Sequence, residues 1–157
     1  MPSLTERFRM ASSANDVWGA VFVATNMYPE AMPDQITAIR VTNRDGVTAG
    51  SIREITYGKE IKRMVARATE EITRVDHEHR TIESRFNNDR EFVGKIFRSA
   101  SLVIKVDPNS FDDGPSSRGC TITWTLTYSG FKDNLNFKMF QDAIGRGFES
   151  LDTYLTN

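Results

Sequence analysis

Hydrophobic and polar residues alternate over much of this chain, which is the pattern of half-buried β-strands. The first example runs from Ser3 to Met10, where Leu4, Phe8 and Met10 share one face. Similar runs predict six more strands, over residues 36–42, 51–57, 64–75, 81–86, 92–106 and 120–128. Short turns separate several of these runs, which favours an antiparallel meander. Within 64–75, the segment Ala66 to Glu71 would also suit a helix.

Three helices are expected beside the strands. Ser13 can cap the first, with Asp16 three residues later in an imperfect capping box. The segment Tyr28 to Pro33 permits only a very short second helix, because its last proline closes it. Near the C-terminus a period of three to four residues predicts a long amphipathic helix from about Asp133 to Thr156. Its apolar stripe consists of Phe140, Ile144, Phe148, Leu151 and Leu155.

This order of elements predicts an α+β architecture. A curved seven-stranded antiparallel sheet would wrap around the long C-terminal helix, with two short helices between strands 1 and 2. That arrangement buries the apolar faces of both the sheet and the helix. Residues 1–157 are expected to form a single domain. Asp107 to Gly119 is dense in Pro, Gly, Ser and Asp, and we interpret it as a long hairpin loop within that domain.

Composition narrows the classes of partner. The chain has 20 basic and 21 acidic residues in 157, so its net charge of −1 gives no general attraction to nucleic acid or an anionic membrane. The basic runs at Arg63–Arg67 and Lys95–Arg98 offer only Phe97 as a stacking aromatic, too few for an RNA-binding sheet. No apolar run reaches the ~18 residues of a membrane span. One cysteine excludes an internal disulfide, and we expect a cytoplasmic protein.

Motifs for metal, nucleophile or cofactor chemistry are absent from the sequence. His77 and His79 are the only histidines, and their place in a predicted turn indicates surface residues rather than metal ligands. Cys120 lies on a predicted strand with no histidine near it in sequence, as expected of a buried, inert thiol. The glycine-containing segment Asp45–Gly50 lacks the lysine of a phosphate loop and is interpreted as a hairpin turn. We therefore expect no metal and no cofactor.

The predicted architecture itself suggests a site. A strongly curved sheet around one helix often leaves space that side chains do not fill, and such a cavity suits a small hydrophobic ligand. The residue pattern alone leaves a cavity and a filled core about equally open.

Several short segments, in register along the chain, are similar to those of one protein family. They are YPEAMP (28–33), GSIREITYG (50–58), VDHEHRTIESRF (75–86), FRSASLVIKVDP (97–108) and TWTLTY (123–128). Through them the chain resembles the birch-pollen-allergen superfamily of plants, that is, pathogenesis-related class ten proteins and, most closely, major latex proteins. The resemblance spans Leu4 to Leu155. It implies the helix-grip fold, related to START lipid-transfer domains, and favours the cavity over the filled core.

Alternation along the strands identifies the candidate cavity wall, because every second side chain faces the helix. The candidate ligand-binding residues are Val21, Phe22, Tyr28, Ile55, Tyr57, Ile82, Ser84, Leu102, Ile104, Trp124, Leu126, Phe140, Ile144 and Phe148. For each of them ordinary core packing is an alternative. Over 64–75 the parity is ambiguous: the apolar set turns Arg67 and Glu71 outward, whereas a shift of one residue would turn them inward.

The family pattern also differs from this chain in places. Ile82 and Ser84 stand where relatives often carry pocket tyrosines, which implies a cavity with fewer phenol hydrogen bonds. Nothing near Tyr57–Glu60 matches the proline-containing gate loop of the abscisic acid receptors, so a receptor of that type is not expected.

The resemblance implies that this protein binds or carries a small hydrophobic plant metabolite, in a role related to plant defence, as a monomer or weak dimer. The alternative is an enzyme of the same fold that cyclises, condenses or isomerises such a metabolite, with Tyr57 as proton donor and Glu71 as base. A third hypothesis, a module that signals ligand occupancy to another protein, depends on Phe111 at the tip of the 107–119 loop.

Overall fold

One antiparallel sheet organises the fold. A computed structural model describes residues 1–109, 119–131 and 137–157. Its seven-stranded sheet has the order β1-β9-β8-β5-β4-β3-β2. These strands are β1 (Ser3–Met10), β2 (Ile36–Asn43), β3 (Ile52–Tyr57), β4 (Arg67–Asp76), β5 (Thr81–Phe86), β8 (Ser99–Pro108) and β9 (Cys120–Ser129). The predicted meander is confirmed.

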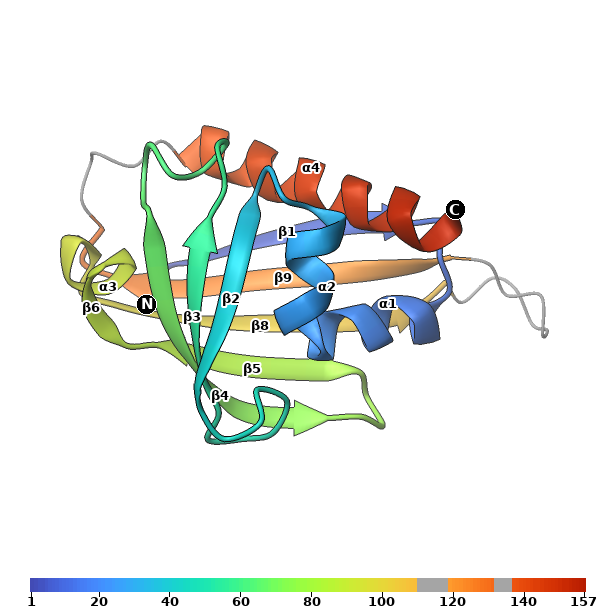
Figure 1. The fold of residues 1–157 in the computed structure, drawn as a ribbon, viewed down its shortest axis with the longest axis horizontal. Helices are drawn as coiled ribbons and strands as arrows, with labels where there is room; N and C mark the ends of the chain where they lie inside the picture. Colours follow the sequence, from blue (N-terminus) through green and yellow to red (C-terminus); the bar gives the residue numbers. More distant parts are fainter. Residues whose placement is uncertain (110–118, 132–136) are drawn as a thin grey trace.

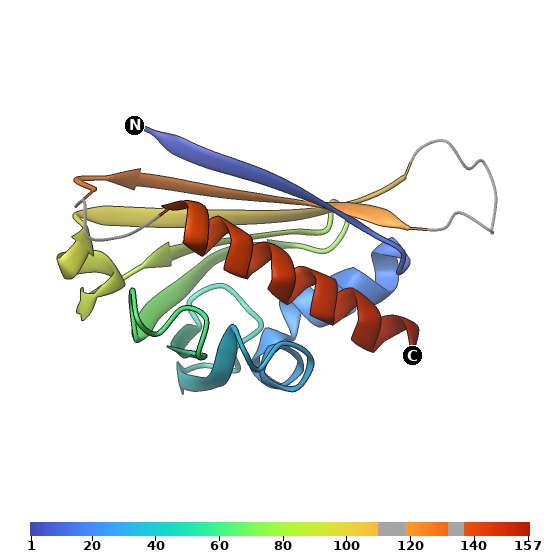
Figure 2. The ribbon, with the colours of Figure 1, turned by 90° about the horizontal axis from the view of Figure 1, so that it is seen from above.

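Helices cover one side of this sheet. The elements α1 (Ala14–Phe22) and α2 (Ala24–Ala31) follow β1, and α4 (Phe137–Thr156) ends the chain. In Figure 1, β2 and β3 run steeply across the direction of β8 and β9, so the sheet curls around its helices. Figure 2 shows α4 lying along the sheet, with α1 and α2 near its C-terminal end. The expected α+β helix-grip architecture is confirmed.

The apolar stripe of α4 explains its position. Phe140, Phe148 and Leu151 are buried, and Ile144 and Leu155 are partly buried against the same core. The predicted start of this helix at Asp133, and most of the predicted 107–119 loop with Phe111, lie outside the described residues.

The N-terminus of α1 is capped as predicted. The backbone N–H of Asp16 donates to Ser13 Oγ at 3.1 Å. The second helix was predicted too short: α2 begins at Ala24, and Pro29 lies inside it. Burial of Ala24, Tyr28 and Ala31 on one face holds the helix in place despite the missing proline N–H.

The strand predicted over 92–106 is wrong in its first part. The chain there forms β6 (Asn88–Glu91), a short helix α3 (Phe92–Lys95) and β7 (Ile96–Phe97) before β8 starts at Ser99. Gly94 has φ +109°, which breaks the extended run. Phe92 and Phe97 are buried in an aromatic cluster with ring centroids 5.1 Å apart, so apolar residues do not imply a strand here.

The strand predicted over 64–75 begins later, at Arg67, and pairs with β3 and β5. The helical alternative for Ala66–Glu71 is therefore wrong. Residues 61–64 form turns instead, in which the backbone N–H groups of Met64 and Val65 donate to the carbonyl of Ile61.

Candidate functional site

A cavity lies between the concave face of the sheet and the helices α2 and α4. Its volume is about 80 Å³, measured as the space open to the centres of water-sized molecules. One water needs only ~10–15 Å³ on that measure. The lining comprises Val21, Ala24, Tyr28, Met32, Gln35, Ile36, Ile39, Arg53, Ile55, Tyr57, Glu70, Ile82, Ser84, Phe86, Phe92, Leu102, Ile104, Trp124, Leu126, Phe140, Ile144 and Phe148.

Thirteen of the fourteen candidate residues from the sequence are in this lining. The exception is Phe22, which is placed elsewhere: its ring packs 5.4 Å from Trp18 and 5.0 Å from His77. The strand residues meet across the sheet in register, with Ile82 opposite Ile104 and Leu102 opposite Leu126. The period-two rule therefore identified the apolar wall.

An ion pair in the wall was missed. Arg53 and Glu70 face each other across β3 and β4, and they are only 5% and 4% exposed. Arg53 Nε donates to Glu70 Oε1 at 2.8 Å, and Arg53 Nη2 donates to the same oxygen. The signal was present in the sequence, because Arg53 shares its face with Ile55 and Tyr57.

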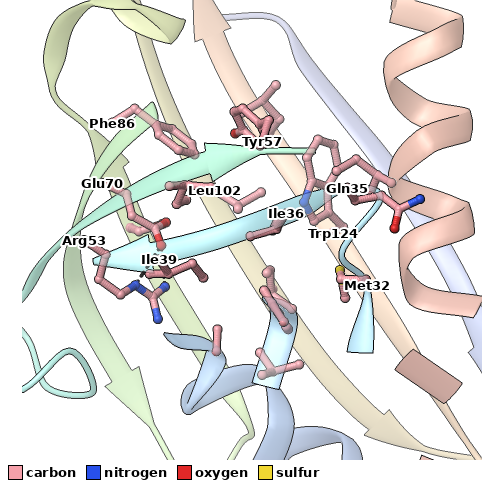
Figure 3. Close-up of a pocket in the computed structure, with 18 of the residues that line it drawn as sticks. Met32, Gln35, Ile36, Ile39, Arg53, Tyr57, Glu70, Phe86, Leu102 and Trp124 are labelled. Carbon is pink, nitrogen blue, oxygen red and sulfur yellow. Dashed lines mark hydrogen bonds and ion pairs between the residues drawn. The ribbon is translucent and has the colours of Figure 1, made fainter. Parts of the chain in front are cut away.

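The second carboxylate oxygen of Glu70 is also occupied. Ser84 Oγ, from β5, donates to Glu70 Oε2 at 2.9 Å. Ser84 stands where the resemblance implied fewer hydrogen bonds from phenols, yet its hydroxyl completes a small polar cluster of Arg53, Glu70 and Ser84. Figure 3 shows Arg53 and Glu70 together on one side of the cavity.

Three polar atoms of the lining are buried and have no hydrogen-bond partner within the described ranges. They are Arg53 Nη1, the Tyr28 hydroxyl and Gln35 Oε1. In Figure 3, Gln35 lies toward α4, across the cavity from Arg53 and Glu70. The other polar atom of this side chain, Gln35 Nε2, donates a hydrogen bond to Glu60 Oε2. Buried polar groups are normally satisfied, so these three atoms are unused hydrogen-bonding capacity on residues of the cavity lining.

The two phenols of the lining remain protonated. Burial raises the pKa of Tyr28, an effect partly offset by Arg53 and reinforced by Glu70. Burial also raises the pKa of Tyr57, and the negative charges of Glu70 and Asp89 add to the rise. Both side chains therefore act as neutral hydrogen-bond donors or acceptors at physiological pH.

The proposed base Glu71 does not line this cavity. It lies on the outer face of β4, where Arg85 Nη2 is 3.4 Å from Glu71 Oε1. Arg67 is also exposed. The parity inferred from the apolar set is thus the observed one, and the alternative register is wrong. Glu70, the residue before Glu71, points into the cavity instead.

The two histidines and the cysteine of the chain do not line the cavity. His77 and His79 are both exposed in the turn between β4 and β5. Trp18 Nε1 donates to His77 Nδ1 at 3.2 Å, and His79 pairs with Asp76. Cys120 is a buried free thiol, and burial raises its pKa to about 12.

The described ranges, 1–109, 119–131 and 137–157, contain no cluster of three or more side chains that could hold a metal ion. In the same ranges, no helix has the length and hydropathy needed to span a bilayer.

Comparison with known proteins agrees with the fold. The family model described as polyketide cyclase / dehydrase and lipid transport matches residues 1–156. MLP-like protein 423 of Arabidopsis thaliana is 27% identical over 146 residues, which cover 92% of this chain and 87% of that protein.

Solved structures show the same architecture. Ginseng major latex-like protein 151 from Panax ginseng superposes with a TM-score of 0.75 at 15% identity, over 99% of this chain and 98% of that one. Ara h 8.0201 gives a TM-score of 0.69 at 18% identity, over 99% and 97%. The resemblance noted from the short segments is confirmed. The chain therefore belongs to the polyketide cyclase / dehydrase and lipid transport family, and it has the helix-grip fold of major latex-like and birch-pollen-allergen-like proteins.

Proposed function

We propose that this protein binds and carries a small, mostly apolar metabolite in the cavity between its sheet and α4. The observation that carries the proposal is an internal space walled by apolar side chains, three of whose lining residues carry a buried polar atom with no partner among the described residues. Such a mixture of apolar walls and few polar groups is typical of small-molecule sites. The family's link to lipid transport supports it.

Apolar burial sets a limit on affinity. A guest the size of one aromatic side chain buries ~150–250 Å², which is about 4–6 kcal/mol at ~25 cal/mol per Å². That range corresponds to dissociation constants no tighter than tens of micromolar, before the cost of association. Selective binding therefore needs the polar groups of the wall.

Titration with N-phenyl-1-naphthylamine, a neutral fluorophore, tests the proposal. We expect saturable binding by the unchanged protein and at least a tenfold loss in Leu102→Trp, which fills the cavity. The control Val103→Trp makes the same kind of change at the next residue of β8, on the opposite face. Circular dichroism checks that both variants fold. Absence of saturable binding, or equal loss in both variants, contradicts the proposal.

A second candidate is an enzyme that cyclises, condenses or isomerises such a guest. The observation in its favour is that Tyr57 and Glu70 line one cavity. Against it, Arg53 and Ser84 already hold both oxygens of Glu70, which leaves the carboxylate poorly placed as a free base. If a diketone cyclises faster with the protein than in buffer, Tyr57→Phe and Glu70→Gln must both slow that reaction.

A further inference from the structure

Arg53 has hydrogen-bonding capacity that the protein does not use. Its Nε and Nη2 both donate to one oxygen of Glu70, while Nη1 is buried and has no partner in the part of the chain that the structure describes. A guanidinium nitrogen is always a donor and never an acceptor. The group that completes this site must therefore supply an acceptor atom.

The Tyr28 hydroxyl is a second unused group of the same cavity. It is buried and has no hydrogen-bond partner among the described residues, and Tyr28 lines the cavity from α2. Because the phenol stays protonated, it can donate to the same acceptor. A carbonyl oxygen has two lone pairs and could accept from both donors.

The charge of the cluster decides which acceptor fits. Glu70 neutralises Arg53, and among the residues that the structure describes no other Lys, Arg or His contributes to the cavity lining. A carboxylate guest would bring a second negative charge beside Glu70 into a site walled mainly by apolar side chains. Like charges in such surroundings are strongly disfavoured. An uncharged oxygen avoids that cost.

We infer that the guest is a neutral molecule carrying a ketone-type oxygen, which accepts hydrogen bonds from Arg53 Nη1 and the Tyr28 hydroxyl, and that carboxylates of the same shape are rejected. This inference rests on the proposed function and adds the chemical class of the ligand.

Three naphthalenes that differ only in the substituent at position 2 test the inference. The compounds 2-acetylnaphthalene, 2-ethylnaphthalene and 2-naphthoate compete at pH 7 against N-phenyl-1-naphthylamine. We expect 2-naphthoate to bind at least tenfold more weakly than the ketone. The preference for the ketone over the ethyl compound should fall at least tenfold in Arg53→Met/Glu70→Met, and at least threefold in Tyr28→Phe.

The double variant removes both charges together, so no buried charge is left unpaired and folding should be retained. The outer-face pair Arg85→Met/Glu71→Met is the matched control, and its ketone preference should equal that of the unchanged protein. Tight binding of 2-naphthoate, or an unchanged preference in Arg53→Met/Glu70→Met, overturns the inference while the proposed function stands. Failure of the fluorophore itself to bind overturns both.

Discussion

Arg53 and Glu70 place two charges inside an otherwise apolar interior. Taking such a pair out of water costs more than a well-packed apolar pair, and exchange for apolar residues is often neutral or stabilising. Their place in the cavity wall, with one guanidinium nitrogen unpartnered, is better explained by recognition of a guest than by stability. The two residues still depend strongly on each other.

Removal of Arg53 alone should therefore strongly destabilise the folded protein. Arg53→Met leaves the Glu70 carboxylate buried without its counter-charge, and we expect the free energy of unfolding to fall by about 3–5 kcal/mol. The control Arg85→Met removes an exposed arginine of the outer face and should change it by less than about 0.5 kcal/mol. Urea unfolding measures both. Equal effects would mean that the Arg53–Glu70 pair contributes no more than a surface pair.

At the scale of elements, Asp152 joins α4 to the junction between β1 and α1. Its carboxylate accepts hydrogen bonds from the backbone N–H groups of Ala11 and Ser12, each at 2.9 Å, and from Ser12 Oγ at 2.6 Å. Burial alone would raise the pKa of Asp152, but these hydrogen bonds outweigh it and hold the pKa below its ordinary value of 3.8. One side chain thus ties the C-terminal part of the long helix to the segment between β1 and α1.

This lowered pKa predicts a pH-dependent contribution to stability. The ionised form is favoured in the folded state, so the contribution is complete above the unfolded pKa of about 3.9 and is lost as pH falls through the folded value. Asp152→Asn should be destabilised relative to the unchanged protein at pH 7, and the gap should shrink below pH ~4. Thermal unfolding at several pH values measures it. Asp142→Asn, on the exposed side of α4, is the control. If the stability difference between Asp152→Asn and the unchanged protein did not vary with pH, the lowered pKa of Asp152 would be contradicted.

Replacement by alanine should change the free energy of unfolding in opposite directions at two glycines. A Cβ at Gly58 would lie 2.4 Å from the carbonyl oxygen of Pro33, which is backbone and cannot swing away. Gly58→Ala should cost about 1–3 kcal/mol. At Gly19, inside α1, a Cβ meets nothing within 4 Å, so Gly19→Ala should stabilise by about 0.5–1 kcal/mol. Denaturant unfolding measures both, and destabilisation by Gly19→Ala would contradict this view of α1.

Alternation and the period of the last helix were enough to predict the whole molecule's architecture. Seven strands, two helices after the first strand and α4 follow from these signals. The segment from Phe92 to Phe97 was not predictable in this way, since its buried aromatics resemble a strand and only Gly94 breaks it. The hydrophobic pattern of a short segment does not predict how the chain turns where it leaves a sheet.

The cavity wall was predictable to the extent that it is apolar. Arg53 and Glu70 obey the same parity as Ile55 and Ile72, but charged residues are almost always exposed, and that expectation outweighed the parity. Whether the space between sheet and α4 was empty or filled could not be predicted, because it depends on side-chain volumes packed in three dimensions. The positions of functional polar groups are thus the least predictable part of the site.

Nuclear Overhauser effects between a bound guest and methyl-labelled isoleucines test the central claim most directly. With 2-acetylnaphthalene at saturation, we expect contacts to the cavity methyl groups of Ile55, Ile82 and Ile104. Ile61 and Ile96 are equally buried but do not line the cavity, and they should show none. Contacts confined to surface residues, or no contacts to the three cavity isoleucines, would contradict the conclusion that this protein binds its ligand inside the sheet.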